Sequence, residues 1–132
     1  MRSILQRKED GNCFLCMILY GDYNRKQTTE HHIVYGRGKR NLSEKYGLKV
    51  YLCENHHQYG KEAVHNNKEM ALLLKETAQI IFMKKYGKKL WMQVFEKNYI
   101  RPETEQWIQE KEKRKETEPG FQRIEGIQGM DW

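Results

Sequence analysis

The sequence predicts an α+β fold, in which a small core with short strands is followed by two or three α-helices. All three cysteines and all five histidines fall between Cys13 and His65, and most come in closely spaced pairs. Two short segments of this region are β-branched or alternate apolar and polar residues, whereas the second half has helical spacing. The chain of 132 residues corresponds to one domain with a tail. We expect a core over residues 1–67, a helical extension over 68–101 that packs on it, and a charged helix with a flexible tail over 102–132.

The elements of the expected core follow from β-branched residues and from turn signals. Residues 27–35 contain several β-branched side chains and predict a first strand, which is followed by a basic, glycine-flanked loop over residues 36–41. Apolar and polar residues alternate over 48–52 and predict a second short strand. Residues 54–59 predict one or two helical turns that end at Gly60.

Helical spacing dominates the rest of the chain. Asn66 or Asn67 predicts the N-cap of a helix whose apolar residues recur three and four positions apart until Gly87 stops it. A second amphipathic helix is expected over 88–98. A third is expected from Pro102 to about residue 118, with charged residues on nearly every side. The glycines that follow predict a loop-like, mobile end.

Composition and hydropathy exclude membrane-spanning and collagen-like proteins. The longest unbroken apolar run, from Cys13 to Tyr20, has eight residues, far short of the roughly 18–20 that a membrane span needs. Acidic residues interrupt the basic segment before this run, and no small-residue cleavage site follows it, so we do not expect it to act as a signal peptide. An odd number of cysteines suits a reducing compartment better than a disulfide framework. We therefore expect a soluble, cytoplasmic chain with no membrane partner.

The cysteine spacing predicts a structural zinc site. Tetrahedral zinc takes four nitrogen or sulfur ligands, and a Cys-x-x-Cys turn supplies two that face one ion. Cys13 and Cys16 form one such pair, and Cys53 and His56 form another. The alternative is that each cysteine is only a small buried apolar side chain. In a core of this size, metal binding would form part of the free energy of folding.

The adjacent histidines predict a second, reactive site. Neighbouring residues point to opposite faces of a strand and diverge by about 100° on a helix. A histidine pair is therefore better suited to two tasks, such as a metal ligand beside a general base, than to one shared ion. A metal held by His31, His57 and His65 would offset charge on phosphoryl oxygens, and His32 would activate the attacking water. The alternative is that each histidine caps a turn or hydrogen-bonds within the core.

Several segments of the expected core occur together in one known family. They are Cys13-x-x-Cys16, Glu-His-His-Ile at 30–33, Leu-Ser-Glu-Lys-Tyr-Gly-Leu at 42–48, Leu-Cys-Glu-Asn-His-His at 52–57 and Val-His-Asn at 64–66. In these segments the chain resembles the HNH (ββα-metal) endonucleases, in particular small phage-borne members and recombination-enhancement nucleases. The resemblance covers about residues 13–67 and implies a zinc-stapled ββα-metal core.

The resemblance also implies a role for each motif residue. The family's middle asparagine, which braces the loop before the helix, corresponds by its order in the chain to Asn41, with Asn55 as an alternative. The catalytic ion stays open among Mg²⁺, Mn²⁺, Ni²⁺ and Zn²⁺, because imidazole suits the last three and Mg²⁺ prefers oxygen. For the remaining positions the implied catalytic metal ligands are His31, His57 and His65, the general base is His32, and the structural zinc ligands are Cys13, Cys16, Cys53 and His56.

The charge balance points to nucleic acid as a partner. The net charge is +6 at pH 7 and the isoelectric point is about 9.2. Basic residues gather on the loop after the proposed base and around the Gly87 turn, where they can contact phosphates without reading sequence. The alternative is an ordinary solvated surface. The expected DNA-binding residues are Arg37, Lys39, Arg40, Lys84, Lys85, Lys88 and Lys89.

Three functions remain open from the sequence. The favoured one is a metal-dependent HNH endonuclease that hydrolyses DNA phosphodiester bonds, encoded by a phage and acting in DNA recombination or processing in the cytoplasm of a bacterial host. The second is a zinc-stapled nucleic-acid-binding module without catalysis, which has no use for His32 or His65. The third is an interaction protein whose long helices bind a partner. A homodimer formed through the apolar helix faces is also left open.

Overall fold

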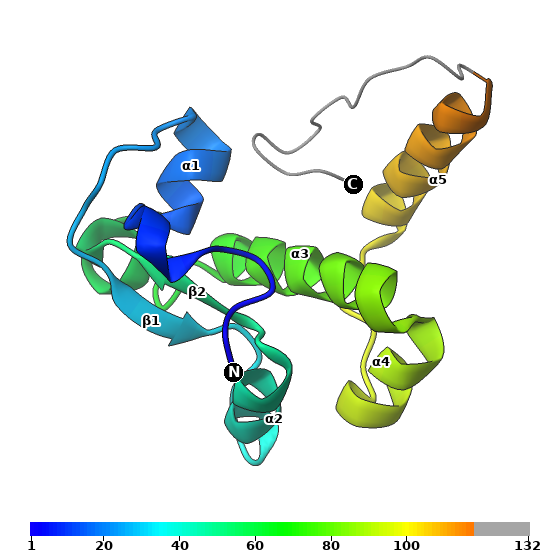
Figure 1. Cartoon of the computed structure of the whole chain (residues 1–132), viewed down its shortest axis with the longest axis horizontal. Coiled ribbons are helices and arrows are strands. Elements are labelled where there is room, and N and C mark those ends of the chain that lie inside the picture. The colour runs from blue at the N-terminus through cyan, green and yellow to red at the C-terminus, as the bar shows by residue number, and fades with distance from the viewer. Residues whose placement is uncertain (118–132) are drawn as a thin grey trace.

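The fold is seen in a computed structural model that describes residues 1–117, with side chains as far as residue 111. The expected mobile end beyond residue 118 lies outside the described residues. The α+β class is confirmed, because a two-stranded antiparallel sheet lies beside one end of a long helix, α3 (Figure 1). In chain order the elements are η1 (Lys8–Asp10), α1 (Phe14–Tyr20), β1 (Thr29–His32), α2 (Lys39–Tyr46), β2 (Lys49–Leu52), η2 (Asn55–Tyr59), α3 (Lys68–Tyr86), α4 (Lys88–Phe95) and α5 (Pro102–Thr117).

The register of the sheet decides which histidines share a face. In the antiparallel pair, His31 lies opposite Val50 and His32 lies opposite Lys49. Because side chains alternate along a strand, Thr29 and His31 project from one face and His32 from the other. Both expected strands are present, although β1 is shorter than the predicted 27–35. This alternation separates the two neighbouring histidines.

The expected basic loop over 36–41 is wrong from Lys39 onward, where α2 begins. A glycine in the left-handed region bounds each end of α2: Gly38 (φ 76°) is the N-cap and Gly47 (φ 73°) is the C-cap. Inside it, the buried Ser43 hydroxyl accepts a hydrogen bond from the Val34 amide (3.1 Å) and donates one to the Val34 carbonyl (2.6 Å). These two bonds hold the segment after β1 against α2.

The apolar run that is too short for a membrane forms the buried helix α1. Phe14 and Leu15 are fully buried in its first turn. Cys13 caps the helix, with its sulfur accepting a hydrogen bond from the Cys16 amide at 3.5 Å. Gly21, with a φ of 65°, ends the helix. The first cysteine pair is therefore held at the N-terminus of a helix that is itself fixed in the core.

The boundaries of α3 follow the local signals that predicted them. The Asn67 side chain accepts hydrogen bonds from the amides of Glu69 (2.9 Å) and Met70 (3.2 Å), which makes Asn67 the N-cap. The helix ends at Tyr86, immediately before Gly87, and α4 begins at the next residue. The described α5 extends from the first residue predicted for it and stands apart from the sheet (Figure 1).

The helical extension shares one hydrophobic core with the cysteine- and histidine-rich segment. Phe82, Trp91 and Phe95 are buried and pack through ring contacts at 4.3–6.0 Å between centres. Tyr46 of α2 joins this group, with its ring 5.4 Å from that of Phe82. Within residues 1–117, none of the helices combines the length and apolar character that crossing a membrane requires.

Candidate metal centres

The structure brings the two predicted zinc pairs together in one cluster. The Nδ1 atom of His56 lies 3.6 Å from the Cys13 sulfur, 3.4 Å from the Cys16 sulfur and 3.5 Å from the Cys53 sulfur. The Cys16 and Cys53 sulfurs are 3.9 Å apart. Tetrahedral zinc separates two sulfur ligands by about 3.8 Å and sulfur from nitrogen by about 3.6 Å. The four side chains therefore already have the spacing of a zinc site.

The chemistry of this donor set also fits zinc. Burial is the main cause that raises the pKa of the Cys13 and Cys16 thiols, and neighbouring thiolate charge adds to it at Cys16. Thiolates gathered here therefore require a positive charge between them, which a zinc ion supplies. On the outer side of the cluster, the Glu62 carboxylate lies 3.5 Å from Nε2 of His56 and accepts a hydrogen bond from the Tyr20 hydroxyl. Such an outer carboxylate orients a ligating imidazole.

The predicted second site is also assembled, from three of its four histidines. The ring centres of His31 and His57 are 5.2 Å apart, those of His31 and His65 5.3 Å, and those of His57 and His65 4.9 Å. One nitrogen from each ring lies within 4.8 Å of the others. Imidazoles that share one ion at about 2.0–2.1 Å have ring centres roughly 5 Å apart. His31 and His57 are buried, whereas His65 is exposed, so the cluster reaches the surface.

A threonine that the sequence did not single out orients this cluster. The Thr29 hydroxyl hydrogen-bonds with Nδ1 of His57 at 2.6 Å, which leaves Nε2 of that ring for an ion. Burial, followed by the charges of His57 and His65, lowers the pKa of His31 to about 3. Burial and His65 also lower the pKa of His57. Both rings are therefore neutral near pH 7, and the neutral ring is the form that binds a metal.

The turn after η2 explains how His65 reaches the cluster. The Val64 amide donates to the His56 carbonyl at 2.8 Å, and the Asn66 side chain donates to the Gln58 carbonyl at 2.6 Å. These bonds fold residues 60–66 back over η2, which carries His57. The longer stretch between His57 and His65 thus forms a return loop that brings the third imidazole into place.

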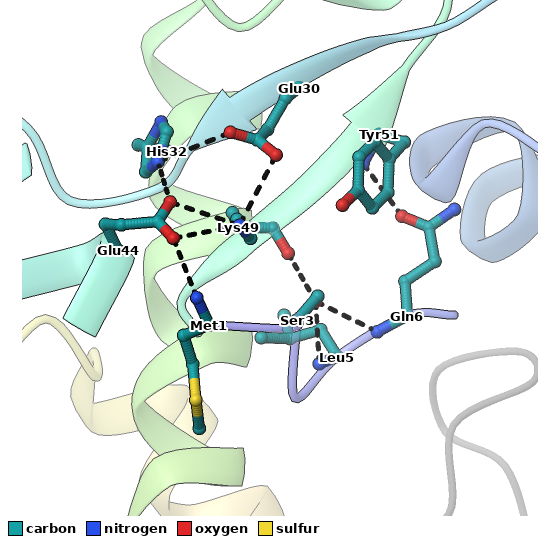
Figure 2. A network of polar contacts seen from close by, with 9 residues as sticks. All are labelled: Met1, Ser3, Leu5, Gln6, Glu30, His32, Glu44, Lys49 and Tyr51. Carbon is teal, nitrogen blue, oxygen red and sulfur yellow. Dashed lines mark hydrogen bonds and ion pairs between the residues drawn. The ribbon is translucent and has the colours of Figure 1, made fainter. Parts of the chain in front are cut away.

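The structure does not place His32 in the three-histidine cluster. On the other face of β1, Nε2 of His32 lies 2.9 Å from Glu44 and 3.5 Å from Glu30 (Figure 2). The Lys49 ammonium, which is almost fully buried, lies 3.1 Å from Glu44 and 3.4 Å from Glu30. The hydrogen bond from His32, followed by those from the chain's α-ammonium group and Lys49, lowers the pKa of Glu44 to about 2. Two carboxylates here already face a cation, which leaves little need for a metal ion among them.

Two further predicted residues have other roles. Asn41 lies exposed on α2, and Ser43, rather than Asn41, braces the segment after β1 through its two bonds to Val34. The Lys39 ammonium donates to the Phe95 carbonyl at 2.9 Å and so ties α2 to α4 instead of facing solvent. Asn55, the alternative for the bracing residue, begins η2.

The predicted basic residues fall into two separated groups. Arg37, just before α2, and Arg40, in its first turn, are exposed and close in sequence to the histidines of β1. Lys84 and Lys85 lie at the far end of α3, and sixteen residues of helix separate Lys84 from the first residue of α3, which is about 24 Å along the axis. Lys88 and Lys89 are exposed at the start of α4, beyond the same turn. The basic residues around Gly87 are therefore remote from His65.

A comparison of the chain with protein-family models, with curated proteins and with solved structures finds no match. The functional argument therefore rests on the residues and on their geometry.

Proposed function

We propose that the protein is a metal-dependent nuclease that hydrolyses phosphodiester bonds in DNA, as the resemblance of residues 13–67 to HNH endonucleases implies. One observation carries the proposal: the imidazoles of His31, His57 and His65 gather in a cluster that opens to the surface at His65, beside a second group of four Cys and His donors. Sites with three protein ligands keep a position open for substrate or water, whereas sites with four do not. The three-histidine cluster is the one that can do chemistry.

The residues of this cluster would hold one divalent ion. Bound there, the ion would polarise a phosphoryl oxygen and offset charge on the leaving oxygen. His31 and His57 are fixed by burial, and Thr29 holds the His57 ring in one orientation. His65 closes the set from the exposed side. The chain itself therefore supplies a positioned ligand set rather than three mobile surface histidines.

His32 is the proposed general base, and Glu44 is its positioning partner. An ionised carboxylate only accepts hydrogen bonds, so Nε2 of His32 carries the proton in the 2.9 Å bond to Glu44. The other ring nitrogen, Nδ1, is then free to take a proton from water. His32 is the last residue of β1, so the proposal requires a phosphate that lies across the end of the strand and reaches both of its faces.

The proposal is tested by incubating the zinc-bound protein with supercoiled plasmid and with circular single-stranded DNA. Mg²⁺, Mn²⁺ or Ni²⁺ is added, and EDTA serves as the control. We expect cleavage with at least one ion, and a loss of at least about 100-fold in rate for His31→Gln, because the ion supplies several kcal/mol. Metal analysis should find two ions per chain in the parent protein and one in His31→Gln, with the melting temperature nearly unchanged.

Two results would contradict the proposal. Undiminished cleavage by His31→Gln would show that the three-histidine cluster is not the catalytic site. Tight DNA binding without cleavage under any ion would favour the alternative, a zinc-stapled nucleic-acid-binding module, in which the Cys₃His cluster alone has a function.

A further inference from the structure

A cavity of about 620 Å³ adjoins the three-histidine cluster, within the range of roughly 300–1,000 Å³ that is typical of ligand sites. It is bounded by the segment after β1, the turn before α3, the first half of α3 and residues 97–99. His65 belongs both to the cluster and to the lining of the cavity. The Tyr35 ring, also in the lining, lies 6.0 Å from that of His31 and 6.2 Å from that of His65. The cavity is therefore continuous with the candidate catalytic site.

The cavity is positively charged. The described residues that line it include Lys68, Lys75 and Lys97 but no carboxylate. The Lys75 ammonium lies 5.3 Å from the centre of the Tyr35 ring and 5.5 Å from that of Tyr99, and the Lys97 ammonium lies 5.2 Å from the Tyr99 ring. Burial, together with the charge of Lys97, lowers the pKa of Lys75, in keeping with cations that gather without an anion. A bound phosphate would provide the missing negative charge.

The far wall of the cavity is held in place before any ligand arrives. The side chain of Gln79, buried on α3, donates to Asn98 at 2.8 Å and accepts from the Tyr99 amide at 2.7 Å. Just beyond, Arg101 forms an ion pair at 3.0 Å with Glu76, which is buried on the same helix. These bonds fix residues 98–101 along α3, so Tyr99 keeps its position beside Lys75 of α3.

We infer that this cavity binds an unpaired nucleotide of a single-stranded nucleic acid next to the phosphodiester bond that the three-histidine site cuts. Lys75 and Lys97 hold the phosphate of that nucleotide, and the Tyr35 ring, which is 47% exposed, stacks on its base. This inference rests on the proposed nuclease function and names the form of its substrate. It also moves the nucleic-acid contact from the Gly87 turn to the cavity.

The choice of a single strand follows from the aromatic lining. Proteins that hold single strands combine cationic grooves with aromatic rings on which bases stack, and stacking is tolerant of sequence. The bases of an intact duplex are stacked on one another and cannot reach a ring at the wall of a cavity. A duplex could use the lysines but would gain nothing from Tyr35.

The test measures binding of a fluorescent oligothymidine and of a matching duplex, by anisotropy, without any added catalytic ion. The zinc-bound His31→Gln protein is used, so that no cleavage occurs. We expect the variant Lys75→Gln/Lys97→Gln to bind the single strand at least about tenfold more weakly and to lower the slope of log K against log salt by about 1.4. Tyr35→Leu should weaken binding of the single strand about fivefold or more, with little effect on binding of the duplex.

A charge-matched control separates the cavity from general electrostatics. Lys8→Gln/Lys45→Gln removes the same charge from exposed positions elsewhere and should change affinity less than about twofold. Equal losses in the two double variants would overturn the inference. So would tighter binding of the duplex, or a larger loss from Lys88→Gln/Lys89→Gln at the start of α4.

The inference and the proposed function fail in different ways. If the cavity variants lose binding but the parent protein never cleaves DNA, the nucleotide site stands and the nuclease proposal falls. If the parent cleaves DNA and the cavity variants cleave and bind as well as it does, the nuclease proposal stands and the cavity is not the nucleotide site.

Discussion

The two histidine-containing clusters share a turn but differ in what closes them. His56 and His57 are neighbours in η2, and both of their amides are directed at the Cys53 carbonyl, at 3.1 and 2.8 Å. His56 joins three cysteines in a cluster whose fourth ligand is already present, whereas His57 joins two other imidazoles in a cluster that opens at His65. One irregular helical turn therefore serves a closed site and an open one.

This difference suits the cysteine cluster to a structural role and the three-histidine cluster to binding a ligand or a substrate. The cysteine cluster connects α1 with the end of β2 and with η2, so an ion bound there would hold α1 to segments that are 37 residues or more away in the chain. The three-histidine cluster takes its side chains from β1, η2 and the loop after it, which the sheet and the turn already bring together. Loss of the first ion should therefore affect folding, and loss of the second should affect only function.

The largest effect is expected for Cys16→Ser. Structural zinc contributes about 10–16 kcal/mol to the folding of small zinc-binding peptides, which is comparable with the whole stability of a domain. We expect the variant to lose zinc and its cooperative thermal unfolding, as measured by metal analysis and circular dichroism. Met17→Leu, a substitution of similar volume at the next residue, is the control and should unfold within a few degrees of the parent. A Cys16→Ser protein that folds and melts like the parent would show that the cysteine cluster is not a zinc staple.

A smaller, purely kinetic effect is expected for His32→Gln. The glutamine amide can still donate to Glu44, so the network in Figure 2 keeps its hydrogen bond while the basic nitrogen is lost. General-base catalysis contributes about 10²–10⁴-fold, and the cleavage rate should fall by that factor. The metal content should stay at two ions per chain, in contrast to His31→Gln. Cleavage at the parent rate would leave His32 only the role of tying β1 to α2.

The pairs Cys13/Cys16 and Cys53/His56 could be predicted from the sequence because the spacing within each pair is local. Cys-x-x-Cys and Cys-x-x-His spacings bring donors together whatever the rest of the fold does, and the alternation along a strand already indicated that His31 and His32 would part. The start of α3 was equally predictable, since an asparagine cap acts within one turn. The neutral state of the buried rings follows only from the packed structure.

The helix α2 and the role of Lys39 depend on contacts between distant residues, which a local sequence pattern does not predict. The helix α2 is fixed by the buried Ser43, whose partner Val34 lies in the segment before the helix, so a basic, glycine-flanked sequence misleadingly indicates a loop. Lys39 bonds to Phe95, 56 residues away, and is therefore not available to DNA in the way its surroundings suggest. Sequence reasoning grouped the cysteines and histidines as the structure brings them together, and it misjudged residues such as Lys39, whose contacts are made with distant partners.

The smallest and most specific effect is expected for a substitution of Thr29, because its side chain contacts the three-histidine cluster and not the cysteine cluster. Thr29→Val keeps the β-branched shape that suits a strand but removes the hydroxyl that orients His57. Loss of such a supporting hydrogen bond typically weakens metal binding about 10–100-fold. We expect that loss for the second ion alone, measured by competition with a chromophoric chelator, while the first ion stays bound. Thr28→Val, which lies one residue before the strand, should leave both affinities unchanged; equal weakening in the two variants would show that the hydroxyl of Thr29 does not support the site.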